Sequence, residues 1–352
     1  MSVRKVICTL TISGLLLAGC AGEPAVSGTP AAAARTAQQA LKAGNYESAV
    51  SNFQTQISSG LDEEGGYRGL GIAYMGLGDY KEAADAFEKA LEYAPAIPGP
   101  MEYDINYYLG SCFYKLGKLD DAKTVYDAII GLRPKDPDAL SMRGTILMSQ
   151  KDTDGMMADY KKAMESDPEN YDRLVQIYQK LAENGYDKQG KELIGEALKE
   201  RGDSMSDYDK GRLSFYAGDY DTAKTCLEKI SDKNNWNVTI LLGQTYEALG
   251  DYNYATSVYE SFLKKDTSHA QVYNQLGLCQ LQQGKYQDAL QSFRQGQTLN
   301  DETMKQSLAF NEIVANEYLG NFQRASVLMA DYVKTYPGDS AAKREYEFLQ
   351  TR

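Results

Sequence analysis

The sequence predicts an all-α fold, an α-solenoid of about nine helix–turn–helix units. Two observations predict it. A helix–turn–helix motif in residues 69–95 recurs along the chain, and a glycine that ends the first helix of each copy returns at intervals close to 34 residues. Neither short helix can bury its apolar face alone, so the copies are expected to stack. The turn glycines are Gly44, Gly78, Gly117, Gly185, Gly218, Gly250, Gly284 and Gly320.

The clearest copy shows why each place needs its residue. Gly78 permits the left-handed backbone that ends the first helix. Gly71 and Ala83 lack bulk and let the two helices approach closely, and Phe87 fills the space beside them. Pro95 stops the second helix, because proline cannot continue one.

The glycine spacing also predicts two irregularities. Gly117 and Gly185 are 68 residues apart, twice 34, so one unit is hidden there with Lys151 in the glycine place. Gly78 and Gly117 are 39 residues apart, which indicates a five-residue insert in the Pro- and Gly-rich segment Ala94–Met101.

These residues resemble a known repeat family. The spacing of Leu70, Gly71, Tyr74, Ala83, Phe87, Ala90 and Pro95 is similar to that of the tetratricopeptide repeat. The resemblance implies a right-handed superhelical solenoid in which the first helix of every unit lines a concave, partner-binding groove. It specifies a fold and an interaction role only.

The first twenty residues are expected to lie outside the fold. Residues 1–19 form a lipoprotein signal peptide: Arg4 and Lys5 precede a mostly apolar run that is too short to span a membrane. The run ends in Leu-Ala-Gly-Cys20, which resembles the bacterial lipobox and implies lipidation of Cys20. The alternatives are an ordinary signal peptide or a short buried helix. Residues 20–29 then form the lipidated cysteine and a flexible tether.

From Pro30 onward the solenoid is expected to run to residue 338. Pro30 follows Thr29, a good helix cap. The fourth unit is degenerate, because Met156 replaces a small alanine, and the ninth lacks the small residue of its first helix. Residues 339–352 form a C-terminal capping helix. The units are expected near 30–63, 64–97, 103–136, 137–170, 171–203, 204–235, 236–269, 270–305 and 306–338.

The net charge of the chain limits the classes of partner that it is expected to bind. The formal net charge is −12. An acidic surface argues against nucleic acid or an anionic membrane face as the main partner, and favours basic or neutral polypeptides.

Nothing in the sequence predicts catalysis, a cofactor or a metal site. The single histidine, His269, lies between two units, and the cysteines Cys112, Cys226 and Cys279 are expected to be buried apolar residues. Asp152-Thr-Asp-Gly155 lacks the remaining ligands of a calcium loop, since Gln150 and Lys161 occupy two of their places, so it is expected to be a turn. The sequence therefore predicts a protein that is not an enzyme.

The family resemblance implies which residues line the groove. The second, fifth, ninth and twelfth places of the first helices are expected to line it. The residues singled out hold the last three of these places, and the alternative for each is plain solvated surface. The candidates are Arg68, Ile72, Met75, Tyr107, Ser111, Tyr114, Thr145, Met148, Gln179, Tyr208, Arg212, Phe215, Gln244 and Asn274.

Two functions follow as expectations. The first is an exported, lipid-anchored scaffold that binds protein or peptide partners through the groove, in cell-envelope assembly or surface complexes. The second is a cell-surface glycan- or peptidoglycan-binding module, or an accessory subunit of an envelope enzyme. The anchor would sit on the outer face of the plasma membrane, or on the outer membrane facing the periplasm.

Overall fold

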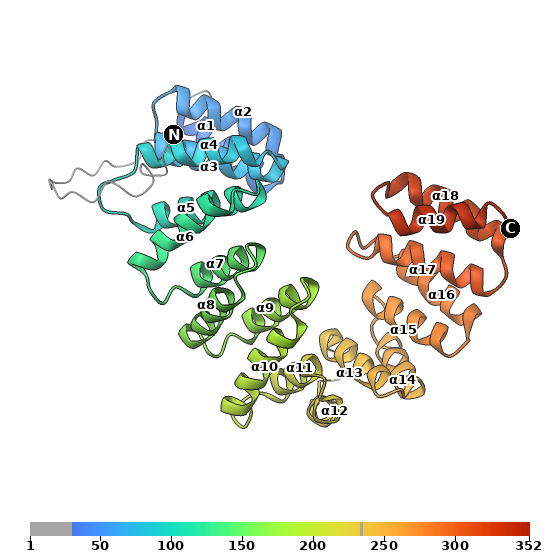
Figure 1. Ribbon diagram of the computed structural model, residues 1–352. Coiled ribbons are helices and arrows are strands. Elements are labelled where there is room, and N and C mark those ends of the chain that lie inside the picture. The colour runs from blue at the N-terminus through green and yellow to red at the C-terminus, as the bar shows by residue number, and fades with distance from the viewer. Residues whose placement is uncertain (1–29, 233–234) are drawn as a thin grey trace. The chain divides into compact units, whose positions relative to one another are not determined.

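The computed structural model describes residues 30–232 and 235–352 of the chain. Within them the regular elements are nineteen α-helices, joined in order as antiparallel neighbours (Figure 1). The chain divides into two compact units, which meet in the sequence between Asn170 and Tyr171. The expected signal peptide, Cys20 and the tether lie outside the described residues.

Unit 1 holds the first four helix pairs, and each helix packs on the next one along the chain. The helices are α1 (Pro30–Lys42), α2 (Tyr46–Ser58), α3 (Glu63–Leu77), α4 (Tyr80–Glu92), α5 (Pro100–Lys115), α6 (Leu119–Leu132), α7 (Pro137–Ser149) and α8 (Thr153–Ser166).

Unit 2 holds five further pairs and one last helix. The helices are α9 (Tyr171–Glu183), α10 (Asp187–Arg201), α11 (Asp207–Ala217), α12 (Tyr220–Lys229), α13 (Trp236–Ala248), α14 (Tyr252–Leu263), α15 (Ala270–Gln282), α16 (Tyr286–Gln297), α17 (Lys305–Tyr318), α18 (Phe322–Thr335) and α19 (Ser340–Leu349). The all-helical, tetratricopeptide-like solenoid predicted from the sequence is therefore confirmed.

The turn inside each pair has the expected backbone. Gly78 ends α3 at φ +83°, and its N–H donates to the Met75 carbonyl. Lys151 takes the same left-handed conformation, with φ +63°, between α7 and α8. The hidden unit predicted from the double glycine step is therefore present. Asp152 follows as the cap of α8 and accepts from the Gly155 N–H at 3.0 Å, so this segment is a turn, as predicted.

Close approach within a pair follows one rule. A glycine of the first helix faces a large side chain that lies sixteen residues later in the second helix. A Cβ added at Gly71 would lie 2.6 Å from the Phe87 ring, and one added at Gly243 would lie 2.2 Å from the Tyr259 ring. The same pairing joins Gly110 to Tyr126, Gly144 to Tyr160, Gly211 to Leu227 and Gly277 to Phe293. Glycine is needed here for space, not for backbone conformation.

The core is a series of local clusters. One in unit 1 extends from Ala83 to Ala163, and separate clusters in unit 2 centre on Tyr259, Phe293 and Met329. Each cluster draws on neighbouring pairs only, as expected for a solenoid. The three cysteines of the described chain are buried with free thiols, as predicted.

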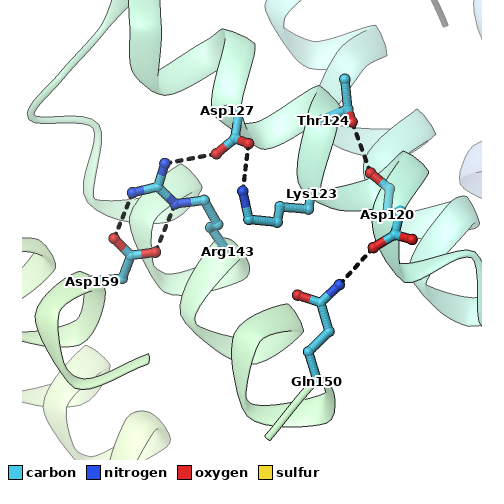
Figure 2. A network of polar contacts seen from close by, with 7 residues as sticks. All are labelled: Asp120, Lys123, Thr124, Asp127, Arg143, Gln150 and Asp159. Carbon is cyan, nitrogen blue, oxygen red and sulfur yellow. Dashed lines mark hydrogen bonds and ion pairs between the residues drawn. The ribbon is translucent and has the colours of Figure 1, made fainter. Parts of the chain in front are cut away.

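A polar network ties α6, α7 and α8 together (Figure 2). The Arg143 guanidinium donates to both carboxylate oxygens of Asp159, through Nε at 2.7 Å and Nη2 at 2.6 Å, and through Nη1 to Asp127 at 2.7 Å. The Lys123 ammonium donates to the other Asp127 oxygen at 2.7 Å. Asp159 is almost fully buried, so its charge depends on Arg143.

The insert between the second and third pairs alters one boundary. Helix α5 begins at Pro100, three residues before the expected start of that unit at 103. Proline suits the first helical position, and the buried Glu102 carboxylate accepts from the Gly99 N–H in front of the helix. The insert thus extends the helix as well as the loop. Within the described chain, every helix is too short or too polar to cross a membrane.

Candidate partner-binding surface

The first helices of successive pairs lie side by side in each unit. In unit 1, α3 contacts both α1 and α5, and in unit 2 contacts link α9, α11, α13, α15 and α17 in sequence. Within each unit, we call the surface formed by the first helices the first-helix face. The candidate residues of the sequence analysis belong to these helices, so their surroundings decide what the face can offer.

In unit 1, several candidates bond sideways to the neighbouring first helix. The Arg68 guanidinium of α3 forms an ion pair with Asp104 of α5, with Nε 2.6 Å from Oδ2, and lies 5.9 Å from the centre of the Tyr108 ring. The Tyr114 hydroxyl of α5 lies 3.4 Å from the Ser149 hydroxyl at the end of α7. These bonds fix the spacing of the first helices.

Tyr107 is held on this face by a carboxylate. Its hydroxyl donates to Asp136, which also caps α7 by accepting from the Ala139 N–H at 3.1 Å. Burial and the Asp136 carboxylate raise the pKa of Tyr107. Ser111 donates to the Tyr107 carbonyl at 2.8 Å and lies 3.1 Å from the Tyr126 hydroxyl. The Tyr107 ring is therefore preorganised.

The remaining candidates of unit 1 differ in how much surface they present. Ile72 and Met75 of α3 are half-buried against the unit 1 core and keep part of their apolar surface open. Thr145 and Met148 of α7 are buried. The Thr145 hydroxyl lies 3.1 Å from the Tyr160 hydroxyl, so it serves the packing of α7 on α8. These two residues add little to the face.

In unit 2 the face centres on Arg212 of α11. Its guanidinium lies between two carboxylates, with Nη1 2.6 Å from Asp172 and Nη2 3.2 Å from Asp209, and 5.2 Å from the centre of the Tyr208 ring. Burial is the main cause that raises the pKa of Tyr208. The arginine joins α9 to α11 as Arg68 joins α3 to α5.

The other candidates of unit 2 follow the same pattern. Gln179 is exposed and donates to the Tyr216 hydroxyl at 3.2 Å. Phe215 and Gln244 are half-buried. Asn274 is buried and accepts from the Asn311 amide of α17 at 2.8 Å. It therefore connects first helices and presents little surface.

Sequence reasoning missed the acidic partners of both arginines. Asp104 and Asp172 occupy the second place of their units, one of the places at which first helices are expected to line the groove. Asp104 lies in the unit after that of Arg68, which holds a fifth place. Asp172 lies in the unit before that of Arg212, which holds a ninth place. The second place belongs to the expected groove places, so naming the residues at it would have found both aspartates.

The described residues offer little for catalysis. Burial raises the pKa of the Cys112 thiol to about 12 and also raises that of Cys279, so both stay protonated at neutral pH. His269 precedes α15, stacks on Trp236 with ring centres 5.3 Å apart, and lies 3.3 Å from Asp266. No cluster of potential metal ligands occurs among the described residues.

Comparison with known proteins agrees with this geometry. Residues 68–137 and 113–171 match the family described as tetratricopeptide repeat, and residues 216–296 match the family described as anaphase-promoting complex, cyclosome, subunit 3. The chain is similar to the protein CTR9 homolog of Arabidopsis thaliana, with 24% identity over 311 residues. That alignment covers 83% of this chain and 28% of the relative, so the chain spans less than a third of that protein.

The chain is also similar to solved structures. Yeast Tom70 is similar over 93% of this chain and 82% of its own, with 14% identity and a TM-score of 0.50. A tetratricopeptide repeat protein from Parabacteroides merdae is similar over 72% of this chain and 98% of its own, with 18% identity and a TM-score of 0.46. From the helix pairs, the turn places and the matched repeats, residues 68–171 carry tetratricopeptide repeats, and the described chain has the architecture of a tetratricopeptide-like solenoid.

Proposed function

We propose that this protein is an exported, lipid-anchored scaffold that binds protein or peptide partners through its first-helix face, in cell-envelope assembly or in surface complexes. The observation that carries the proposal is the construction of that face. Arg68 and Arg212 each hold two neighbouring first helices together. The Tyr107 hydroxyl is held by Asp136, and the Tyr208 ring lies beside Arg212. Rigid aromatic residues with open apolar neighbours suit an extended or helical segment.

The charge supports a polypeptide partner. The chain has a formal net charge of −12, and Asp104, Asp136, Asp172 and Asp209 lie among the aromatic residues of the face. Because Arg68 and Arg212 are already paired with these acids, the face is poor in free positive charge. It therefore favours a neutral or basic segment over an acidic one.

The anchor rests on the sequence alone. Cys20 follows Leu-Ala-Gly after a charged start and a short apolar run, the order of a lipoprotein signal. Lipid chains on Cys20 would hold the protein on the outer face of the plasma membrane, or on the outer membrane facing the periplasm.

Capture from detergent-solubilised envelope tests the binding role. Wild-type protein is expected to retain a partner that a Met75→Glu, Tyr208→Glu double variant loses, because the added charges oppose burial of the face. Tyr254→Glu is the matched control, since Tyr254 is 54% exposed on the second helix α14. Equal recovery with all three proteins would contradict the proposal. Retention on peptidoglycan without any protein partner would support the glycan-binding alternative instead.

Fractionation tests the anchor separately. Cys20→Ser is expected to move the protein from the membrane pellet to the soluble fraction, because the residue can no longer carry lipid. Cys279→Ser keeps the lipobox and serves as control. Membrane retention of the Cys20→Ser protein would refute the anchor and leave the binding role open.

A further inference from the structure

The exposed apolar side chains of unit 1 gather at one edge. Successive helices are antiparallel, so the connections between pairs, at residues 59–62, 93–99 and 133–136, lie at the edge where α1 begins, and the turns within pairs lie at the opposite edge (Figure 1). We call the first of these the inter-pair edge. It carries five of the six exposed large hydrophobic side chains in the described part of unit 1, namely Leu61, Tyr93, Ile97, Met101 and Leu132.

The sixth such side chain, Leu77, lies at the opposite edge. Unit 2 has no such bias in its described part. Its exposed large hydrophobic side chains lie near turns within pairs, in the middle of a helix and near the end of α19, and Leu299 alone lies between pairs. The inter-pair edge of unit 1 is therefore a local feature and not a general property of the repeat.

The insert makes this edge protrude. Ala94–Met101 contains three prolines and no charged residue, and Ile97 at its middle is 80% exposed. The prolines fix the backbone, and the Glu102 carboxylate accepts from the Gly99 N–H at the base of the loop. Tyr93 stacks on Tyr67 with ring centres 5.8 Å apart. A stiff apolar loop loses little conformational entropy when it is buried. Its exposure therefore indicates a surface that another molecule or a membrane covers.

The length of chain between Cys20 and Pro30 points to what covers this surface. Cys20 and Pro30 are ten residues apart, so a lipid on Cys20 lies at most about 35 Å from the start of α1. Helices α1, α3 and α5 contact one another in turn, and contacting helices lie about 8–10 Å apart, so the start of α5 is roughly 20 Å from that of α1. The apolar loop thus lies within the reach of the tether and on the same edge.

We propose that the inter-pair edge of unit 1 rests on the lipid bilayer, with Ile97 and Met101 inserted at the membrane interface. This inference rests on the proposed lipid anchor. The edge bears charges of both signs, with Asp62 and Glu63 beside Leu61 and Arg133 and Lys135 beside Leu132. The contact is therefore apolar, and neither anionic lipid nor low salt is required.

Quenching of a single tryptophan by brominated lipids tests the contact. The native Trp236 is replaced by phenylalanine, tryptophan is placed at residue 97, and the full lipidated chain is reconstituted in phosphatidylcholine vesicles. Ile97→Trp is expected to show blue-shifted emission and strong quenching by brominated acyl chains, both unchanged at high salt. Leu77→Trp, at the opposite edge, is the matched control and is expected to show neither.

Different results would contradict the lipid anchor and the membrane contact of the inter-pair edge. If the protein binds vesicles but tryptophan is unquenched at both residue 97 and residue 77, the membrane contact of the edge is refuted. The lipid anchor is then unaffected. A chain that carries no lipid would refute the anchor. In that case a hexahistidine tag in place of Cys20, on nickel-chelating lipids, supplies the tether, and quenching at residue 97 still decides the edge. A blue shift that needs an added envelope protein, without lipid quenching, would also overturn the edge.

Discussion

At the scale of single residues, Lys151 stands where the other turns have glycine. Its φ of +63° places its Cβ close to backbone atoms, and this conformation costs an L residue roughly 1–2 kcal/mol. The Lys151 side chain is exposed. The packing of the surrounding helix pairs therefore offsets the local backbone strain at Lys151.

Lys151→Gly is expected to raise the free energy of unfolding by about 0.5–1 kcal/mol, because relief of the strain outweighs the greater freedom of glycine in the unfolded chain. Gly117→Lys, at the same place in the preceding unit with φ +71°, is expected to lower it by a similar amount. Denaturant unfolding measures both changes. Destabilisation by Lys151→Gly would contradict the assignment of residue 151 to the turn place.

Gly243 tests the close approach of a helix pair. A Cβ there would lie 2.2 Å from Tyr259 Cζ, so Gly243→Ala is expected to destabilise by about 1–3 kcal/mol despite the better helix propensity of alanine. Gly195 lies in α10 with no atom near its added Cβ, and Gly195→Ala is expected to stabilise by up to about 1 kcal/mol. Opposite shifts in thermal unfolding confirm the packing role, and equal shifts would refute it.

Glu64 is expected to make the free energy of unfolding depend on pH. Burial and the neighbouring Glu102 carboxyl raise the pKa of Glu64 to about 7. Because the folded pKa lies above the unfolded value near 4.5, the stabilising contribution of protonated Glu64 is fully present below pH 4.5 and is lost as pH rises through 7. Glu64→Gln is expected to be more stable than the wild type at pH 8, with the difference vanishing near pH 4.5. Unfolding midpoints across this range measure it, and a constant difference would contradict the assignment.

At the scale of helices, side-chain bonds set how neighbouring elements lie. Arg68 spaces α3 from α5, Arg212 spaces α9 from α11, and Arg143 joins α6, α7 and α8. The fourth pair is the degenerate one, with Met156 fully buried where alanine was expected, and the Arg143 network lies in this pair. The packing there depends on a charge as well as on apolar contact.

Arg143→Ala is expected to destabilise strongly, by about 3–5 kcal/mol, because it leaves the buried Asp159 carboxylate without a partner. Arg143→Met combined with Asp159→Leu is expected to lose much less, since no unpaired charge remains. Chemical denaturation of both proteins checks the order. A double variant less stable than Arg143→Ala would show that the ion pair itself supplies the stability.

The helix pairs were predictable and the bonds between them were not. The turn at Lys151 and the space beside Gly71 follow from local sterics at fixed spacing, which a sequence displays directly. The pairing of Arg68 with Asp104 depends on how two first helices lie across a 36-residue separation. Buried Asn274 likewise bonds to a residue outside its own pair, Asn311 of α17.

At the scale of the whole molecule, units 1 and 2 carry the helix pairs, and the proposed lipid anchor at Cys20 precedes them in the sequence. The described chain supplies the fold and the first-helix face, and Cys20 lies outside the described residues. The acidic charge, the paired arginines and the fixed tyrosines all favour a neutral or basic polypeptide as partner. The tether and the inter-pair edge of unit 1 would place that partner close to the membrane.

Photo-crosslinking in intact cells tests the central claim most directly. A photoreactive phenylalanine analogue replaces Tyr107 in unit 1, Tyr208 in unit 2, or Tyr254 on the second helix α14. If the first-helix face binds the partner, discrete protein adducts are expected at residues 107 and 208 and none at residue 254. Adducts at residue 254 alone, or no protein adduct from either first-helix position in correctly folded protein, would contradict it.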